Sequence, residues 1–126
     1  MEPNKTITIA VVDDHPLVRD GMRDILMQMG FSVIIQAEHG EHLLSQLSTA
    51  PVLPDLCLLD INMPIMNGME TTIAMKQQWP AIKIIGYTFN TSQADAMLES
   101  GADACLQKCR SALELKKTII ELINIA

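Results

Sequence analysis

The sequence has few aromatic residues and little positive charge. Its 126 residues include one Trp, one Tyr and two Phe, and 9 basic side chains stand against 15 acidic ones, a net charge of −6. Proteins that bind single-stranded nucleic acid stack bases on aromatic side chains, and DNA-binding surfaces are positively charged. We therefore expect no direct contact between this chain and nucleic acid. A basic partner surface or a divalent cation suits the negative charge better.

Long apolar segments and paired cysteines are also missing. No apolar run approaches the roughly 20 residues of a membrane span, and no basic segment followed by a long apolar one marks a signal peptide. The three cysteines, Cys57, Cys105 and Cys109, lack zinc-finger spacing, and Cys57 lies in an apolar run that predicts a core position. We expect a reducing compartment, a cytoplasmic location and no membrane contact.

The residues that are present predict one compact domain over 1–126. Hydrophobic residues make up 48% of the chain, which is typical of a globular protein, and the nine methionines are interpreted as core filler. No internal repeat, low-complexity tract or second domain is visible, so we expect no output domain within these residues.

Strand-like and helix-like segments alternate along this domain. Short apolar runs predict strands at 7–12, 33–35, 56–59, 82–87 and 102–106, and helical spacing predicts helices at 16–29, 41–47, 69–78, 93–100 and after Ser111. Ser92 and Ser111 are expected N-caps, and Gly30 is an expected C-cap. The last helix has one apolar stripe, formed by Ala112, Leu115, Ile119, Leu122 and Ile123. The alternation predicts an α/β fold, a parallel sheet with helices on both faces.

Polar side chains follow four of the five predicted strands. Asp13 and Asp14 follow the first, Asp60 the third, Thr88 the fourth and Lys108 the fifth. The carboxyl ends of parallel strands lie along one edge of the sheet, where ligands bind. Each residue alone has an ordinary interpretation as a turn residue, helix cap or solvated charge. Their joint position at one edge favours a single site.

Three neighbouring carboxylates repel one another unless a cation lies between them. Oxygen ligands in an open site suit Mg²⁺, which keeps several waters and often shares a phosphate. A lysine offsets the remaining negative charge, and a threonine hydroxyl donates to a phosphoryl oxygen. A carboxylate nucleophile with these groups predicts a phosphoryl-transfer site.

Four segments of the chain resemble the receiver domain of bacterial two-component response regulators. They are VVDDHPLVRDGM (11–22), PDLCLLDINMPIMNGME (54–70), KIIGYT (83–88) and SGADACLQK (100–108). The first is most similar to receivers of the NarL/LuxR type, which usually carry a C-terminal helix-turn-helix domain. The resemblance implies a flavodoxin-like (CheY-like) (βα)5 fold with strand order 2-1-3-4-5.

The resemblance also implies a role for each matching residue. Asp60 matches the phosphoacceptor, which takes a phosphoryl group from the phosphohistidine of a sensor histidine kinase. Lys108 matches the lysine that contacts the phosphoryl group, and Thr88 matches the switch hydroxyl. The Mg²⁺ ligands are implied to be Asp13, Asp14, Asp60 and the backbone carbonyl of Asn62. Pro64 and Gly68 are implied to shape the loop after the acceptor, and Asn62 and Asn90 to tune hydrolysis of the acyl phosphate.

The sequence departs from the receiver pattern around the lysine. Receivers often have Tyr or Phe three residues before it, a ring that rotates inward when the threonine moves. Here that residue is Cys105, and a proline common after the lysine is replaced by Cys109. Tyr87 and Phe89, which flank Thr88, are candidates to take the place of the missing ring.

The three histidines are open to a functional and a local interpretation. His15 as a phosphodonor, and His39 with His42 as a metal pair, are the functional interpretations. A contact at the start of the first helix for His15, and a solvated loop and helix start for the other two, are the interpretations we favour.

Three hypotheses for function follow from these residues. The first is a signalling switch that catalyses only its own phosphorylation and dephosphorylation, with a histidine kinase as partner, a DNA-binding domain as output and dimerisation on phosphorylation. The second is a phosphatase or phosphotransferase of the haloacid-dehalogenase type, which the adjacent aspartates and the lack of a cap disfavour. The third is a pseudo-receiver that binds partners without phosphorylation.

Overall fold

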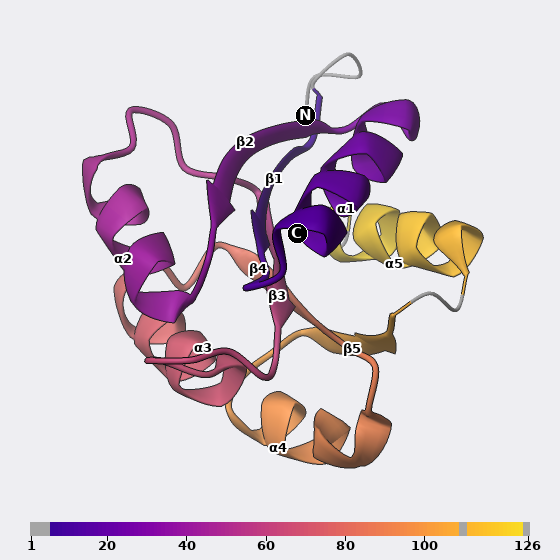
Figure 1. Cartoon of the computed structure of the whole chain (residues 1–126). Helices are drawn as coiled ribbons and strands as arrows, with labels where there is room; N and C mark the ends of the chain where they lie inside the picture. The colour runs from indigo at the N-terminus through magenta and orange to yellow at the C-terminus, as the bar shows by residue number, and fades with distance from the viewer. Residues whose placement is uncertain (1–5, 109–110, 125–126) are drawn as a thin grey trace.

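Five parallel strands form one sheet in the order β2-β1-β3-β4-β5 (Figure 1). The computed structural model describes residues 6–108 and 111–124. The strands are β1 (Thr8–Val12), β2 (Ser32–Ala37), β3 (Leu56–Asp60), β4 (Lys83–Thr88) and β5 (Ala104–Gln107). Both the parallel sheet and the order 2-1-3-4-5 agree with the predictions from the sequence.

Helices cover both faces of this sheet. They are α1 (Pro16–Gln28), α2 (Gly40–Thr49), α3 (Gly68–Gln78), α4 (Ala94–Glu99) and α5 (Ala112–Asn124), with a short 3₁₀ turn, η1 (Thr91–Gln93), before α4. In Figure 1, α1 and α5 lie side by side on one face, and α2, α3 and α4 cover the other. The α/β fold class is therefore confirmed.

The strands are apolar because both of their faces are buried. Leu56 and Leu58 of β3 pack with Leu26 of α1 and Leu115 of α5, whereas Cys57 and Leu59 face the opposite cluster, which contains Leu43, Met75 and Met97. Every residue of β3 is buried, including Asp60 at its end. The core position predicted for Cys57 is confirmed.

The structure corrects several boundaries and caps. Strands β3 and β4 extend through Asp60 and Thr88, so these residues end their strands rather than follow them. Ser92 does not cap the fourth helix: the Asn90 side chain accepts a hydrogen bond from the Ser92 backbone N–H and starts η1 instead. Ser111 does accept from the Glu114 N–H at 3.1 Å, as expected of a cap. Ala112 is exposed and does not belong to the buried stripe of α5.

The loop from Asp60 to α3 depends on a close approach between backbones at Gly68. A Cβ at Gly68 would lie 2.8 Å from Ile61 Cα and 2.9 Å from the Asp60 carbonyl oxygen. Ile65, which the sequence did not single out, has a left-handed backbone at φ 68°. Asn67 and Glu70 form a capping box at the start of α3. Backbone packing thus ties α3 directly to the end of β3.

Within the described residues, the structure has no helix with the length and apolar character to cross a membrane.

Candidate phosphoryl-transfer site

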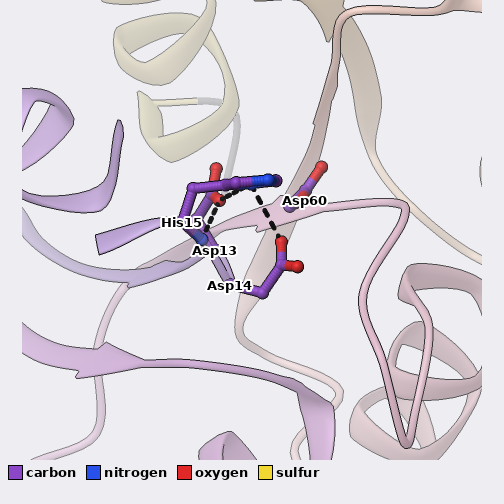
Figure 2. Close-up of side chains that lie close together, drawn as sticks. All are labelled: Asp13, Asp14, His15 and Asp60. Atoms are coloured by element: carbon purple, nitrogen blue, oxygen red, sulfur yellow. Dashed lines mark hydrogen bonds and ion pairs between the residues drawn. The ribbon is translucent and has the colours of Figure 1, made fainter. Parts of the chain in front are cut away.

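Three carboxylates and an imidazole meet at the carboxyl edge of the sheet (Figure 2). Asp13 and Asp14 follow β1, and Asp60 ends β3, which pairs with β1. His15 comes next in the chain and is the N-cap residue of α1. Each of the four side chains offers one ligand atom, and these atoms lie within 4.8 Å of one another. The structure thus brings together the acidic residues that the sequence placed at one edge.

Lys108 joins this group from the end of β5. Its Nζ lies 2.6 Å from Asp13 Oδ2 and 3.2 Å from Asp60 Oδ1. The residue is only 5% exposed, so water competes little with the carboxylates for its ammonium group. A buried lysine between two buried carboxylates places compensating positive charge where a phosphoryl group would add negative charge.

The carboxyl of Asp60 is harder to ionise than an ordinary aspartate. Burial away from water raises the pKa of Asp60 above its usual 3.8, and the negative charges of Asp13 and Asp14 act in the same direction. The charge of Lys108 and its hydrogen bond lower the pKa but do not cancel the effect of burial. Because the ionised form of Asp60 is disfavoured, any cation that binds at the site stabilises it.

One carboxylate oxygen of Asp14 is buried in a position that suits such a cation. Its Oδ1 is buried without a hydrogen-bond partner, although His15 Nδ1 lies 3.1 Å away at an ion-pair distance. The same Nδ1 lies 3.2 Å from Asp13 Oδ1, and one ring nitrogen carries at most one hydrogen. The Nδ1 hydrogen therefore cannot make a full hydrogen bond to both carboxylates at once. The donor set of carboxylate oxygens fits a divalent cation such as Mg²⁺.

Thr88 and Asn90 lie at the same edge but are hydrogen-bonded to each other. The Thr88 hydroxyl donates to the Asn90 backbone oxygen and accepts from the Asn90 N–H, both at 3.2 Å. The Thr88 residue is buried, whereas Asn62 and Asn90 are exposed, as is Pro64. The hydroxyl of Thr88 is thus engaged by the β4–α4 loop and not by the acidic residues.

Cys105 occupies the place where many receivers have an aromatic ring. It pairs with Gly86 across β4 and β5, and its Sγ would lie 3.3 Å from a Cβ added at Gly86. Burial raises the pKa of Cys105, and burial of Cys57 raises that thiol's pKa to about 12, so neither is a thiolate at neutral pH. Cys109 lies outside the described residues. Cys105 therefore acts as a small packing residue against α4.

An aromatic ring nevertheless contacts the site from another position. Lys108 Nζ lies 5.0 Å from the centroid of the Phe89 ring, a cation–π distance. Phe89 is 57% exposed, so most of its ring faces solvent. Tyr87, on the other side of Thr88, packs in the cluster beneath α1 and α5. Phe89 is therefore the flanking aromatic residue seen in contact with the site lysine.

The histidines are where the local interpretation placed them. His15 starts α1, and its backbone N–H donates to Asp13 Oδ1 at 2.9 Å. His39 caps α2 by accepting from the His42 N–H at 3.1 Å. What the sequence reasoning missed is that the His15 ring faces both acidic side chains. The adjacency in the motif DDH was the available signal.

Comparison with known proteins agrees with this geometry. The family model described as the response regulator receiver domain matches residues 9–120. The nitrate/nitrite response regulator protein NarL of Escherichia coli strain K12 is 31% identical over 122 residues, covering 94% of this chain and 56% of NarL. The sensor histidine kinase RcsC of Salmonella typhi is 34% identical over 120 residues, covering 94% of this chain and 12% of the kinase.

The fold comparison gives the same result. A two-component response regulator of the LuxR family from Aurantimonas sp. SI85-9A1 has a TM-score of 0.86 at 27% identity, covering 95% of this chain and 86% of that chain. The chain spans about half the length of NarL. The similarity to NarL and to a LuxR-family regulator agrees with the resemblance seen in the first motif, residues 11–22. The chain belongs to the response regulator receiver domain family of two-component systems.

Proposed function

We propose that this receiver domain is a phosphoacceptor and that Asp60 takes a phosphoryl group from the phosphohistidine of a sensor histidine kinase. One observation carries the proposal: the Asp60 carboxyl ends a fully buried strand between the acidic pair and the buried Lys108. The strand holds the nucleophile in place at the edge of the sheet where ligands of such folds bind.

In the transfer, a carboxylate oxygen of Asp60 forms a bond to phosphorus, and the bond from phosphorus to the donor's imidazole nitrogen breaks. Lys108, already 3.2 Å from Asp60 Oδ1, stabilises the negative phosphoryl oxygens. The Thr88 hydroxyl leaves Asn90 and donates to one of these oxygens. Asp13, Asp14, Asp60 and the Asn62 carbonyl are the proposed ligands of Mg²⁺, which when bound neutralises charge on the phosphoryl group.

The chain catalyses only this transfer to itself and the later hydrolysis, and it turns over no external substrate. The adjacency of Asp13 and Asp14 supports this view, because haloacid-dehalogenase-like enzymes use a D-x-D pattern after their first strand. Phosphorylation then shifts the population between two conformers. The similarity to NarL, of which the chain covers 56%, supports a longer response regulator. A DNA-binding output and dimerisation on phosphorylation are part of the same proposal. The similarity to RcsC supports the alternative that the receiver is a segment of a sensor histidine kinase.

The phosphoacceptor proposal is tested with a small phosphodonor such as acetyl phosphate. We expect intact-protein mass spectrometry to show addition of one phosphoryl group in the presence of Mg²⁺ and none after chelation. Asp60→Asn should show no addition, while Asp55→Asn, which removes a carboxylate at the opposite end of β3, should behave as the wild type. Equal labelling of Asp60→Asn would contradict the proposal, and an unlabelled wild type would favour the pseudo-receiver.

We also propose that Phe89 replaces the missing ring at Cys105 as the aromatic group that responds to phosphorylation. Its contact with Lys108 is made in the unphosphorylated state and competes with the phosphoryl group for the ammonium. A cation–π contact at an exposed site contributes about 0.5–1 kcal/mol, which changes an equilibrium about two- to fivefold. Phe89 therefore favours the inactive conformer.

Phe89→Leu should shift the conformer equilibrium of the unphosphorylated domain about two- to fivefold toward the active state, because Lys108 is released. The measurement is the position of backbone amide peaks between their free and beryllofluoride-bound NMR shifts. Cys105→Ser is the matched control and should leave the peaks near their free positions. A shift in the control and none in Phe89→Leu would contradict the role of Phe89.

A further inference from the structure

His15 lies inside the acidic cluster and not beside it. Its Nδ1 is 3.2 Å from Asp13 Oδ1 and 3.1 Å from Asp14 Oδ1, and Figure 2 shows the ring over both carboxylates. Two local features hold the residue there. Its backbone N–H donates to Asp13 Oδ1 at 2.9 Å, and Pro16, the first residue of α1, fixes the backbone that follows. The backbone of His15 is therefore fixed where its ring can reach both carboxylates.

Hydrogen bonding alone leaves this arrangement incomplete. The Nδ1 hydrogen satisfies Asp13 or Asp14 but not both, and Asp14 Oδ1 remains a buried oxygen without a partner. If Nδ1 carries a lone pair instead, it faces two carboxylate oxygens with like partial charge. Both conflicts disappear when one cation accepts all three lone pairs.

The distances also suit ligands of one ion. Adjacent ligands of a six-coordinate ion with bonds of about 2.1 Å are about 3.0 Å apart. The separations of Nδ1 from the two aspartate oxygens, 3.2 and 3.1 Å, are close to this value. Lys108 neutralises the other oxygen of Asp13, Oδ2, and leaves Oδ1 facing the ring. The ring is 65% exposed at its side chain, so an ion reaches it from solvent.

We propose that His15 Nδ1 is a nitrogen ligand of the cation site and raises its affinity for a borderline dication such as Co²⁺ relative to Mg²⁺. Imidazole suits first-row transition ions, whereas Mg²⁺ prefers oxygen donors and retained water. The inference rests on the cation site of the proposed function. It differs from that proposal because the proposed Mg²⁺ ligands are all oxygen atoms and do not include His15.

The test compares two ions in three proteins by titration calorimetry. In His15→Ala, the dissociation constant for Co²⁺ should rise about tenfold or more, since loss of an outer-shell partner already costs 10–100-fold. The constant for Mg²⁺ should change less than about twofold, because magnesium takes oxygen ligands. The control is His42→Ala, an exposed imidazole on α2, and both constants should match the wild type.

A second measurement does not depend on a variant. The Co²⁺-loaded wild type should show one strongly hyperfine-shifted, exchangeable imidazole N–H in its proton NMR spectrum, and His15→Ala should lack it. The inference is overturned if that resonance is absent, or if His15→Ala weakens Co²⁺ and Mg²⁺ equally. If the wild type binds Co²⁺ but not Mg²⁺, the proposed magnesium site fails while the role of His15 stands.

Discussion

Lys108→Ala should lower the free energy of unfolding by about 3–5 kcal/mol in metal-free buffer at neutral pH, the cost typical of removing one partner from a buried ion pair. The variant leaves Asp13 and Asp60 buried without the ammonium that lies 2.6 and 3.2 Å from them. Denaturant unfolding followed by circular dichroism measures the change. Mg²⁺ should restore part of the loss, because a cation between the carboxylates replaces the missing charge.

The matched control for this variant is Lys76→Ala. Lys76 pairs with Asp103 at 2.9 Å, but both side chains are about one quarter exposed, at 24% and 23%. A more solvated pair contributes about 0.2–1 kcal/mol, so the control should lose far less stability than Lys108→Ala. Equal losses in the two variants would show that burial of Lys108 between two carboxylates is not what makes it costly to remove.

Asp60→Asn should have the opposite effect on stability and raise the free energy of unfolding at neutral pH by about 1–2 kcal/mol, an ordinary size for one substitution. Burial and the neighbouring Asp13 and Asp14 disfavour the ionised form of Asp60. Asparagine has nearly the same shape and carries no charge, and Lys108 keeps its contact with Asp13. The same variant loses phosphoryl acceptance, so activity and stability change in opposite directions.

The sign of the pH dependence follows from the raised pKa of Asp60. As pH rises through the ordinary value near 3.8, the unfolded chain releases this proton first while the folded chain keeps it. The folded state then binds more protons, so wild-type stability falls relative to Asp60→Asn until pH passes the raised folded pKa. Below the ordinary value the two proteins should be equally stable. A gap that widens toward acid pH would contradict the raised pKa.

The parts of the fold that were predicted correctly depend on patterns local in sequence. Leu56–Leu59 reads as a buried strand because it is apolar without interruption, and the topology of a parallel sheet then brings Asp13, Asp14, Asp60 and Lys108 to one edge. Placing these residues needed only the order of strands and not the detailed packing. The edge at which the strands end was therefore predicted correctly, although the strand boundaries themselves were one or two residues off.

The parts that were missed depend on how side chains share partners. The sequence did not show that two hydrogen bonds with Asn90 hold the Thr88 hydroxyl in the β4–α4 loop. The left-handed backbone conformation in the loop between β3 and α3 belongs to Ile65. A glycine is needed at position 68 because the backbone of Ile61 lies close to it, and residue propensities do not reveal such a contact between backbones. Asn90 caps the 3₁₀ turn η1, so Ser92 lies inside that turn and does not cap α4, although both residue types are good caps.

The central claim is that Asp60, among the carboxylates of this site, is the phosphoacceptor. The most direct measurement is borohydride reduction after incubation with Mg²⁺ and acetyl phosphate, which converts an aspartyl phosphate to homoserine, followed by peptide mass spectrometry. We expect homoserine at position 60 alone, with Asp13 and Asp14 unchanged in the same digest. Homoserine at position 13 or 14, or at none of the three in a protein shown to be folded, would contradict the account.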